Sequence, residues 1–314
     1  MARVSGRALD AAGITDSGLR ADYEVCRRLN KAHGRTYYLS TILLPPEKRP
    51  YVWALYGFAR RADEFVDAQS IPDAAALLDW GRTFLDSLTP STTAGPPPAD
   101  PVARAMAHTM RRWAIPRAHV EAFLESMQMD LTVSSYPTYA DLEQYMYGSA
   151  AVIGLQMLPI LEPMAPEAGS RARALGEAFQ MTNFIRDVGE DLSLRGRIYL
   201  PMEDLEVFGV TREILAAGAV TPPVRELLRF EIERTRALYS FAEPGIAMVH
   251  PTSRDCLRTA FTLYGGILEE VEANEYQVLT DRVAVPLRRR LAVSGRAWRH
   301  ARRTRRDQSR WQAA

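Results

Sequence analysis

Apolar residues recur at helical spacing along most of this 314-residue chain, and this pattern limits the folds open to it. No segment alternates clearly between polar and apolar residues, and no Asn-Gly or Asp-Gly pair marks a β-hairpin. A period of 3.6 residues places apolar side chains on one face of an α-helix, whereas a strand needs a period of two. The sequence therefore predicts an all-α fold. The predicted helices cover residues 22–33, 46–69, 73–88, 101–114, 117–133, 138–158, 168–193, 222–243, 252–275 and 286–305.

The composition is that of a globular protein. Hydrophobic residues make up 47% of the chain and charged residues 25%, which excludes a disordered chain and allows one large core. The two cysteines, Cys26 and Cys256, form no CxxC pair, so we expect a reducing compartment and a cytoplasmic location. The N-terminus lacks the apolar run of a secretory signal. The longest apolar stretch, residues 149–161, is too short for a bilayer span, which needs about 20 residues.

The predicted helix that contains residues 51–68 carries a polar stripe beside its apolar one. Four residues at positions i, i+4, i+7 and i+11 share one narrow face: Tyr56, Arg60, Asp63 and Asp67. The two carboxylates lie one turn apart, roughly 6 Å along the helix axis. Such pairs usually belong to a solvated face or to ion pairs, so this stripe alone does not identify a site.

The segment 177–201 repeats this arrangement. Its polar stripe uses positions i, i+3, i+7 and i+11 and consists of Gln180, Asn183, Asp187 and Asp191. The apolar stripe of the same segment is centred about 110° away around the helix. A helix packed by that apolar stripe turns its acids toward the edge of a cavity rather than straight into solvent. The match between the two segments favours one shared site.

Two such stripes facing each other would bring at least four oxygen donors together. Mg²⁺ prefers oxygen ligands and is commonly shared between carboxylates and substrate phosphates. A bound metal neutralises the charge that develops on a departing phosphate. Arginine side chains match phosphate oxygens with two parallel hydrogen bonds, and both stripes have arginine neighbours, namely Arg60, Arg186, Arg195 and Arg197. The residues therefore point to a metal-bound diphosphate.

Several segments resemble the squalene/phytoene synthase family, most closely its bacterial phytoene synthases. The most specific is Q-x-T-N-x-x-R-D-V-x-E-D followed by G-R-x-Y-L-P, within residues 174–201, and ALYGFARRADEFVD at 54–67 also matches. The resemblance implies an isoprenoid-synthase-type helical bundle with a central active-site cavity. It implies a single prenyl-diphosphate synthase domain at 22–291, between an N-terminal segment at 1–21 and an Arg-rich tail at 292–314.

The resemblance also implies an activity, in which a prenyltransferase joins two geranylgeranyl diphosphates head to head (1′–1) through prephytoene diphosphate. The product is phytoene, in carotenoid biosynthesis. Mg²⁺ is the expected metal, with Mn²⁺ as an alternative, and no NADPH is expected. The implied metal ligands are Asp63, Asp67, Asn183, Asp187 and Asp191. The implied catalytic residues are the four aspartates of this set and Tyr264. The implied substrate contacts are His33, Tyr56, Arg60, Tyr145, Gln180, Asn183 and Arg186.

Some positions depart from the family pattern or admit a second interpretation. Glu64 stands where relatives often have a second Asp, and Gly34 stands where they often have Ser. The missing hydroxyl at Gly34 removes one phosphate contact. His33 is equally explained as a helix-end histidine without a substrate role.

Three other functions compete with phytoene synthesis. Farnesyl diphosphate as substrate would give a squalene, dehydrosqualene or presqualene diphosphate synthase. An inactive homologue would bind only lipid or a partner enzyme, although all four stripe aspartates are present. Nucleic-acid binding through the Arg-rich end is not expected, because no recognised nucleic-acid module accompanies it. The oligomeric state is left open.

The net charge of +1 conceals an uneven distribution. Residues 286–314 carry ten Arg and one acid, whereas residues 1–285 carry a net charge of −8. The simpler interpretation of the basic end is a solvated terminal helix or a frayed tail. The alternative is a peripheral contact with anionic lipid, with Trp298 and Trp311 at the interface.

Overall fold

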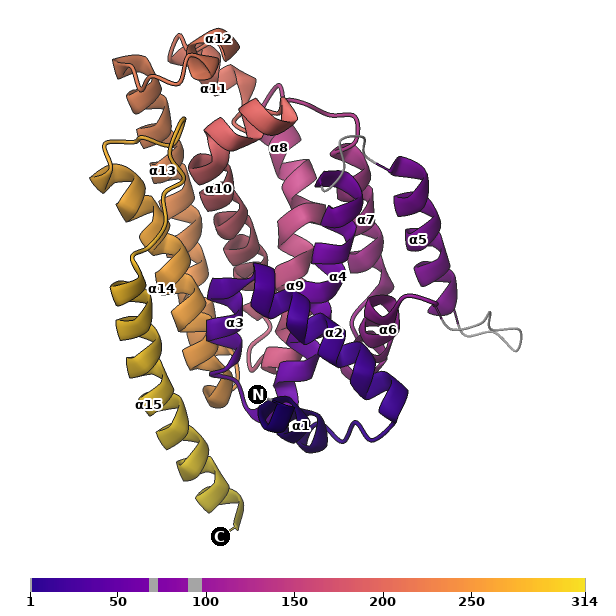
Figure 1. Ribbon diagram of the computed structural model, residues 1–314. Helices are drawn as coiled ribbons and strands as arrows, with labels where there is room; N and C mark the ends of the chain where they lie inside the picture. Colours follow the sequence, from indigo (N-terminus) through magenta and orange to yellow (C-terminus); the bar gives the residue numbers. More distant parts are fainter. Residues whose placement is uncertain (1, 68–72, 90–97, 314) are drawn as a thin grey trace.

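The computed structural model describes residues 2–67, 73–89 and 98–313; within these ranges the side chains of residues 2–5, Arg35, Asp67 and 308–313 are not described. The described residues form helices joined by loops, and no strand occurs among them beyond two isolated bridges. The all-α prediction is confirmed (Figure 1).

The bounds of the helices follow the chain. The α-helices are α1 (Ala2–Ala11), α2 (Ser17–His33), α3 (Arg35–Thr41), α4 (Arg49–Asp67), α5 (Ala74–Ser87), α6 (Pro101–Trp113), α7 (Arg117–Met129), α8 (Tyr139–Met146), α9 (Val152–Leu161), α10 (Ala168–Arg195), α11 (Met202–Val207), α12 (Arg212–Ala216), α13 (Pro222–Ala242), α14 (Pro251–Ala273) and α15 (Leu287–Ala313). Short 3-10 helices cover Pro46–Lys48 and Glu243–Met248, and a π-helical turn covers Tyr147–Ala151.

All ten predicted helices are present in the described residues, but several bounds differ. α2 begins at Ser17 rather than at 22, α15 ends at Ala313 rather than at 305, and residues 46–48 form a separate 3-10 helix. Residues 68–69 of the predicted helix 46–69 lie outside the described residues. The predicted helix 138–158 is divided into α8, the π turn and α9. The predicted helix 117–133 ends at Met129. Four helices of the structure lie outside the predicted set: α1 has ten residues, and α3, α11 and α12 have only five to seven. Segments this short hardly repeat an apolar stripe, so periodicity does not reveal them.

Local signals explain where several helices begin and end. Thr138 and Asp141 form the predicted capping box at the start of α8, in which each side chain accepts from the backbone of the other. Aspartate side chains accept from the first turns of α2, α5 and α6. Gly196 ends α10 in a left-handed conformation with φ of 65°, which glycine adopts without steric cost.

The core consists of two clusters that meet around α10. One surrounds α10, α13 and α14 and contains Met181, Ile185 and Leu228. The other surrounds α2, α4, α6 and α7 and contains Tyr23 and Phe58. α10 runs through the middle of the molecule between α13 and α9 (Figure 1). One side of α10 therefore packs on α13 and α14 of the first cluster, and another side packs on α9, whose buried apolar residues belong to the second cluster.

Close backbone contacts at glycines set the position of α10. A Cβ atom at Gly176 would lie 2.4 Å from the carbonyl oxygen of Ala150, and one at Gly189 would lie 2.0 Å from that of Leu279. No side chain fits at either distance. The second contact holds the segment after α14 against α10 near its acidic residues, so this segment becomes part of the site.

The Arg-rich end forms a docked helix. α15 runs along the outside of α14 (Figure 1). Ala301 is buried, and Arg305 donates from Nη1 to the carbonyl oxygens of Leu43 and Leu44 at 2.8 and 3.1 Å. Of the two simpler interpretations, a terminal helix with a largely exposed surface is confirmed for the described part of this segment, and a frayed tail is wrong, because Ala301 and Arg305 hold the helix against the rest of the chain.

Candidate active site

A cavity of about 520 Å³ lies between α4 and α10. α10 lines it along its whole length, from Ala168 to Arg195, and the step from Ala168 to Asp187 alone covers about 28 Å along the helix axis. Most side chains that line the part away from the acids are apolar, including Leu55, Phe123, Ile153, Met157, Leu161, Leu175 and Phe179. The cavity thus joins a charged end to a long apolar interior. We call the charged end the acidic rim; its described residues are Asp63, Asn183, Arg186, Asp187, Glu190, Asp191, Arg195 and Arg282.

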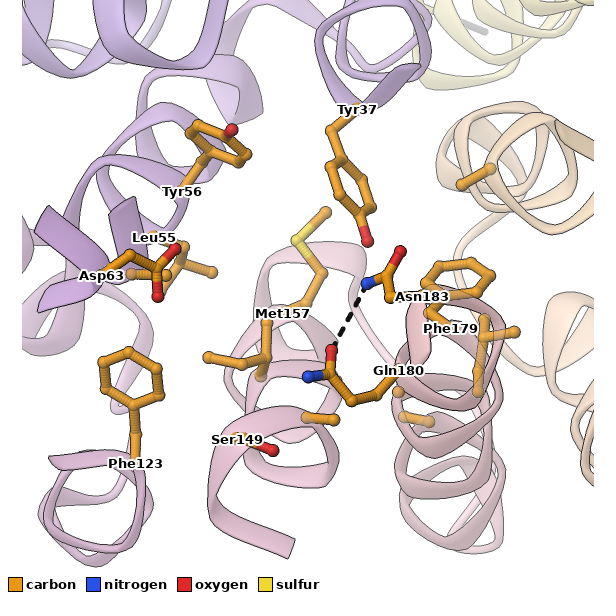
Figure 2. Close-up of a pocket in the computed structure, with 18 of the residues that line it drawn as sticks. Tyr37, Leu55, Tyr56, Asp63, Phe123, Ser149, Met157, Phe179, Gln180 and Asn183 are labelled. Carbon is orange, nitrogen blue, oxygen red and sulfur yellow. Dashed lines mark hydrogen bonds between the residues drawn. The ribbon is translucent and has the colours of Figure 1, made fainter. Parts of the chain in front are cut away.

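α4 supplies one wall of this cavity. Asp63 and Tyr56 both line it, and Figure 2 shows their side chains on the side opposite α10. Burial and the neighbouring Asp63 carboxylate raise the pKa of the Tyr56 phenol, so this side chain stays protonated. Asp67 ends α4, and its side chain lies outside the described residues. Arg60 does not line the cavity.

α10 supplies the facing wall. All four residues of its predicted polar stripe line the cavity: Gln180, Asn183, Asp187 and Asp191. Asn183 donates from Nδ2 to Gln180 Oε1 at 3.4 Å, as drawn in Figure 2. The Asn183 Oδ1 atom is buried and has no hydrogen-bond partner. The two polar stripes, which are more than a hundred residues apart in sequence, therefore face the same space.

Arginine side chains neutralise the acids of the rim. Arg186 donates from Nε to Asp187 Oδ1 at 2.8 Å and from Nη2 to the other oxygen. Arg195 donates from Nη1 to Asp191 Oδ1 at 3.0 Å. Arg282, from the segment held by Gly189, approaches Asp187 to 3.4 Å with Nε. The rim therefore holds both carboxylates and arginines, the groups that bind cations and phosphate oxygens, respectively.

Two residues of the acidic rim, Arg282 and Glu190, are not among the site residues predicted from the sequence. Arg282 stands far along the chain from either acidic stripe. Glu190 lies one position before Asp191, lines the cavity and pairs with Arg282 at 3.6 Å. Only the packing of the loop on α10 brings these residues together.

The oxygen donors of the rim fit a hard divalent cation. Asp63, Asn183, Asp187 and Asp191 all line the same cavity, and the buried Asn183 Oδ1 needs a partner that the protein does not provide. Within the described ranges, no three His, Cys, Asp or Glu side chains already stand close enough to hold a metal. Asp187 and Asp191 are paired with arginines instead, so metal binding would require these pairs to rearrange.

Three of the predicted site residues lie away from the cavity surface. Tyr264 is buried behind Phe179, whose ring stacks on it at 4.5 Å, and it does not line the cavity. His33 is exposed in the last turn of α2. Arg60 approaches Glu64, its neighbour one turn on, at 3.7 Å. Direct roles for these residues stay predictions.

The two departures from the family pattern have local explanations. Glu64 points to arginines of its own helix, with Arg61 Nη1 at 2.9 Å. At Gly34, a Cβ atom would lie 2.6 Å from the Tyr56 ring. A serine there would require the Tyr56 ring to shift, so Gly34 permits the position that this ring takes.

Tyr145 lines the cavity and belongs to a buried polar network. Its hydroxyl donates to Asp130 Oδ2 at 2.8 Å, and the hydroxyl of Tyr199 donates to Asp130 Oδ1 at 3.0 Å. Asp130 is only 8% exposed and lines the cavity as well. No repeated spacing in the sequence indicates a role for it.

The chain is similar to known proteins over most of its length. A family model for squalene/phytoene synthase matches residues 30–289. The phytoene synthase of Arthrospira platensis is 37% identical over 278 residues, which cover 84% of this chain and 88% of that protein. The 15-cis-phytoene synthase of Synechocystis sp. is 36% identical over 292 residues, covering 89% and 85%.

Solved structures are similar over almost the same length. A dehydrosqualene synthase in complex with ligand superposes with a TM-score of 0.80 at 30% identity, covering 89% of this chain and 96% of that chain. The squalene synthase HpnC from Alicyclobacillus acidocaldarius superposes with a TM-score of 0.75 at 28% identity, covering 85% and 98%.

Proposed function

The chain belongs to the squalene/phytoene synthase family, and we propose that it joins two geranylgeranyl diphosphates head to head to form phytoene through prephytoene diphosphate. The relatives named phytoene synthase support this product. One observation carries the proposal: two facing polar stripes of α4 and α10 meet at one end of a long apolar cavity. That arrangement suits a substrate with a diphosphate head and a long hydrocarbon tail.

At the acidic rim, Asp63, Asp67, Asn183, Asp187 and Asp191 are the proposed ligands of Mg²⁺, with Mn²⁺ as an alternative. When bound, the metal would neutralise the negative charge of the leaving diphosphate. Arg186, Arg195 and Arg282 stand at the same rim, and we propose that they turn from the carboxylates to phosphate oxygens once metal and substrate arrive. Charge-assisted hydrogen bonds of this kind hold the diphosphate in place.

The apolar interior would hold the tails and protect the cation that forms when diphosphate leaves. Apolar walls exclude water, which would quench the cation. Aromatic faces attract positive charge, and Tyr37, Tyr56 and Phe184 all line the cavity. The exposed position of His33 supports its helix-end interpretation. Tyr264 would act through Phe179 and Tyr37, which it contacts.

The direct test incubates the purified protein with Mg²⁺ and either geranylgeranyl or farnesyl diphosphate, with and without NADPH. We expect phytoene from geranylgeranyl diphosphate, independent of NADPH. C30 products from farnesyl diphosphate would favour the second candidate, a dehydrosqualene or squalene synthase, which the two solved structures named above support. Binding of either substrate without turnover would favour an inactive homologue.

We also propose that α15 contacts an anionic membrane, where a water-insoluble C40 product would be delivered. Leu287, Leu291 and Trp298 are exposed at positions i, i+4 and i+11 of this helix, so they share one face. Arg288, Arg299 and Arg302 are exposed along one edge of that face. Apolar side chains bordered by arginines suit the interface of an anionic bilayer. Among the described residues, no helix is long and apolar enough to cross a membrane.

A further inference from the structure

Asp130 is a buried carboxylate on the wall of the cavity. It follows the last residue of α7, and two tyrosine hydroxyls donate to its two oxygens, Tyr145 at 2.8 Å and Tyr199 at 3.0 Å. All three residues line the cavity. Burial, and next the Asp130 charge, raise the pKa of both phenols, so both tyrosines stay protonated and donate.

Arg197 completes this network. Its Nη2 donates to the backbone oxygen of Asp130 at 2.6 Å, and its Nη1 donates to the Tyr199 hydroxyl at 3.3 Å. Arg197 is 9% exposed. A buried carboxylate is costly unless a cation and hydrogen bonds compensate it, and this network supplies both. The site therefore holds a negative charge beside an apolar cavity.

The network lies just inside the acidic rim. The ring of Phe184 stacks on Tyr199 at 4.2 Å and lies 6.3 Å from the ring of Tyr145. Phe184 precedes Asp187 by three residues, which is about 4.5 Å along the axis of α10. In a head-to-head product, the central double bond joins the two carbons that carried the diphosphates. The proton that is lost to form this bond therefore leaves from a carbon near the rim, at the level of Tyr145.

We propose that Asp130 is the final acceptor of this proton and that Tyr145 relays it; this rests on the proposed function. One C–H bond of the last cation breaks, and its electron pair becomes the central double bond. The proton passes to the Tyr145 oxygen while the Tyr145 O–H proton moves along the 2.8 Å hydrogen bond to Asp130 Oδ2. The cation and the carboxylate both end neutral. Tyrosine alone would be left as a protonated phenol, which is why the carboxylate is needed.

The test compares the two halves of the reaction in Asp130→Asn. The amide has the same shape, but it cannot take up the proton. We expect geranylgeranyl diphosphate still to be converted into prephytoene diphosphate, while conversion of prephytoene diphosphate into phytoene falls on the order of a hundredfold. The missing phytoene should appear as prephytoene diphosphate or as C40 alcohols formed by water. Tyr145→Phe should give the same pattern, because it removes the relay and leaves Asp130 with Tyr199.

Asp204→Asn is the matched control. Asp204 is also a buried carboxylate held by an arginine, with Arg234 Nη1 at 2.7 Å, but it does not line the cavity. It should leave the ratio of phytoene to prephytoene diphosphate unchanged. A merely structural role of Asp130 would lower both half-reactions together and would overturn the relay. A wild-type ratio in both Asp130→Asn and Tyr145→Phe would also overturn it. A wild-type enzyme that makes neither compound overturns the proposed function itself.

Discussion

Arg186 holds the carboxylate of Asp187, its own neighbour in α10, through two hydrogen bonds, one of them from Nε at 2.8 Å. The central acid of the α10 stripe is thus neutralised from within its own helix, while Asp63 faces it across the cavity from α4. The same carboxylate is reached by Arg282 from the segment after α14. Metal binding and diphosphate binding should therefore be coupled, because each would take over one partner of these pairs.

Loss of a rim acid should abolish product formation. We expect Asp63→Asn and Asp187→Asn each to lower turnover at least on the order of a hundredfold, because a ligand to the proposed metal loses its charge. The change in melting temperature should be small. The measurement is phytoene formation at saturating Mg²⁺, with Asp79→Asn, an exposed acid on α5, as control. Turnover like that of the wild type in either rim variant would contradict the metal site.

Arg282 should contribute to substrate affinity rather than to folding. Its side chain contacts Asp187 and Glu190 but is 61% exposed. Little packing is therefore lost in Arg282→Ala. One charge-assisted hydrogen bond to phosphate is worth about 1.5 kcal/mol, and we expect KM to rise about tenfold. Arg282→Lys should recover part of this effect. An unchanged KM in Arg282→Ala would exclude contact with the diphosphate.

Glu231 should make the free energy of unfolding depend on pH. Burial in α13 raises the pKa of this carboxyl to about 8, although Arg234 donates to it at 2.9 Å. A folded-state pKa above the unfolded one means that the folded state holds the proton more tightly. Stability from this group is therefore present at about pH 4 and is lost as pH rises toward 8.

The variant Glu231→Gln should remove this dependence. We expect the melting temperature of the variant minus that of the wild type to increase as the pH is raised from 5 to 8.5, because glutamine never becomes charged. The difference between the two proteins cancels the titration of shared groups such as histidines. A difference that stays constant over this pH range would show that Glu231 does not titrate there.

The exposed face of α15 should determine membrane binding. We expect Leu291→Asp to weaken sedimentation with vesicles of anionic lipid about tenfold, because the binding free energy from burying one leucine side chain is lost. High salt should weaken the sedimentation further. Val207→Asp changes another exposed apolar side chain, on α11, and is the control. Equal binding of both variants, or binding to neutral vesicles as strong as to anionic ones, would exclude this contact. Deleting residues 296–314 is less informative, because it also removes the docked Ala301.

Features that depend on neighbours along one helix could be predicted from the sequence. The spacing of Asp63 on α4 and of Asp187 on α10 sets their helical faces, because 3.6 residues per turn hold in any helix. The capping box of Thr138 and Asp141 is local in the same way. The apolar stripes then determine which face each helix buries. The sequence therefore predicts that the two acidic stripes meet at a cavity.

Which distant residues touch was decided by packing alone. Asp130 meets Tyr145 and Tyr199 because three separate segments converge on the cavity wall, and Arg282 reaches Asp187 because Gly189 lets a loop lie against α10. Such contacts depend on how all buried faces fit together, which no spacing along the chain encodes. The helical faces and the family are thus properties of the sequence, whereas the charge pairs of the rim and the buried Asp130 network exist only in the folded protein.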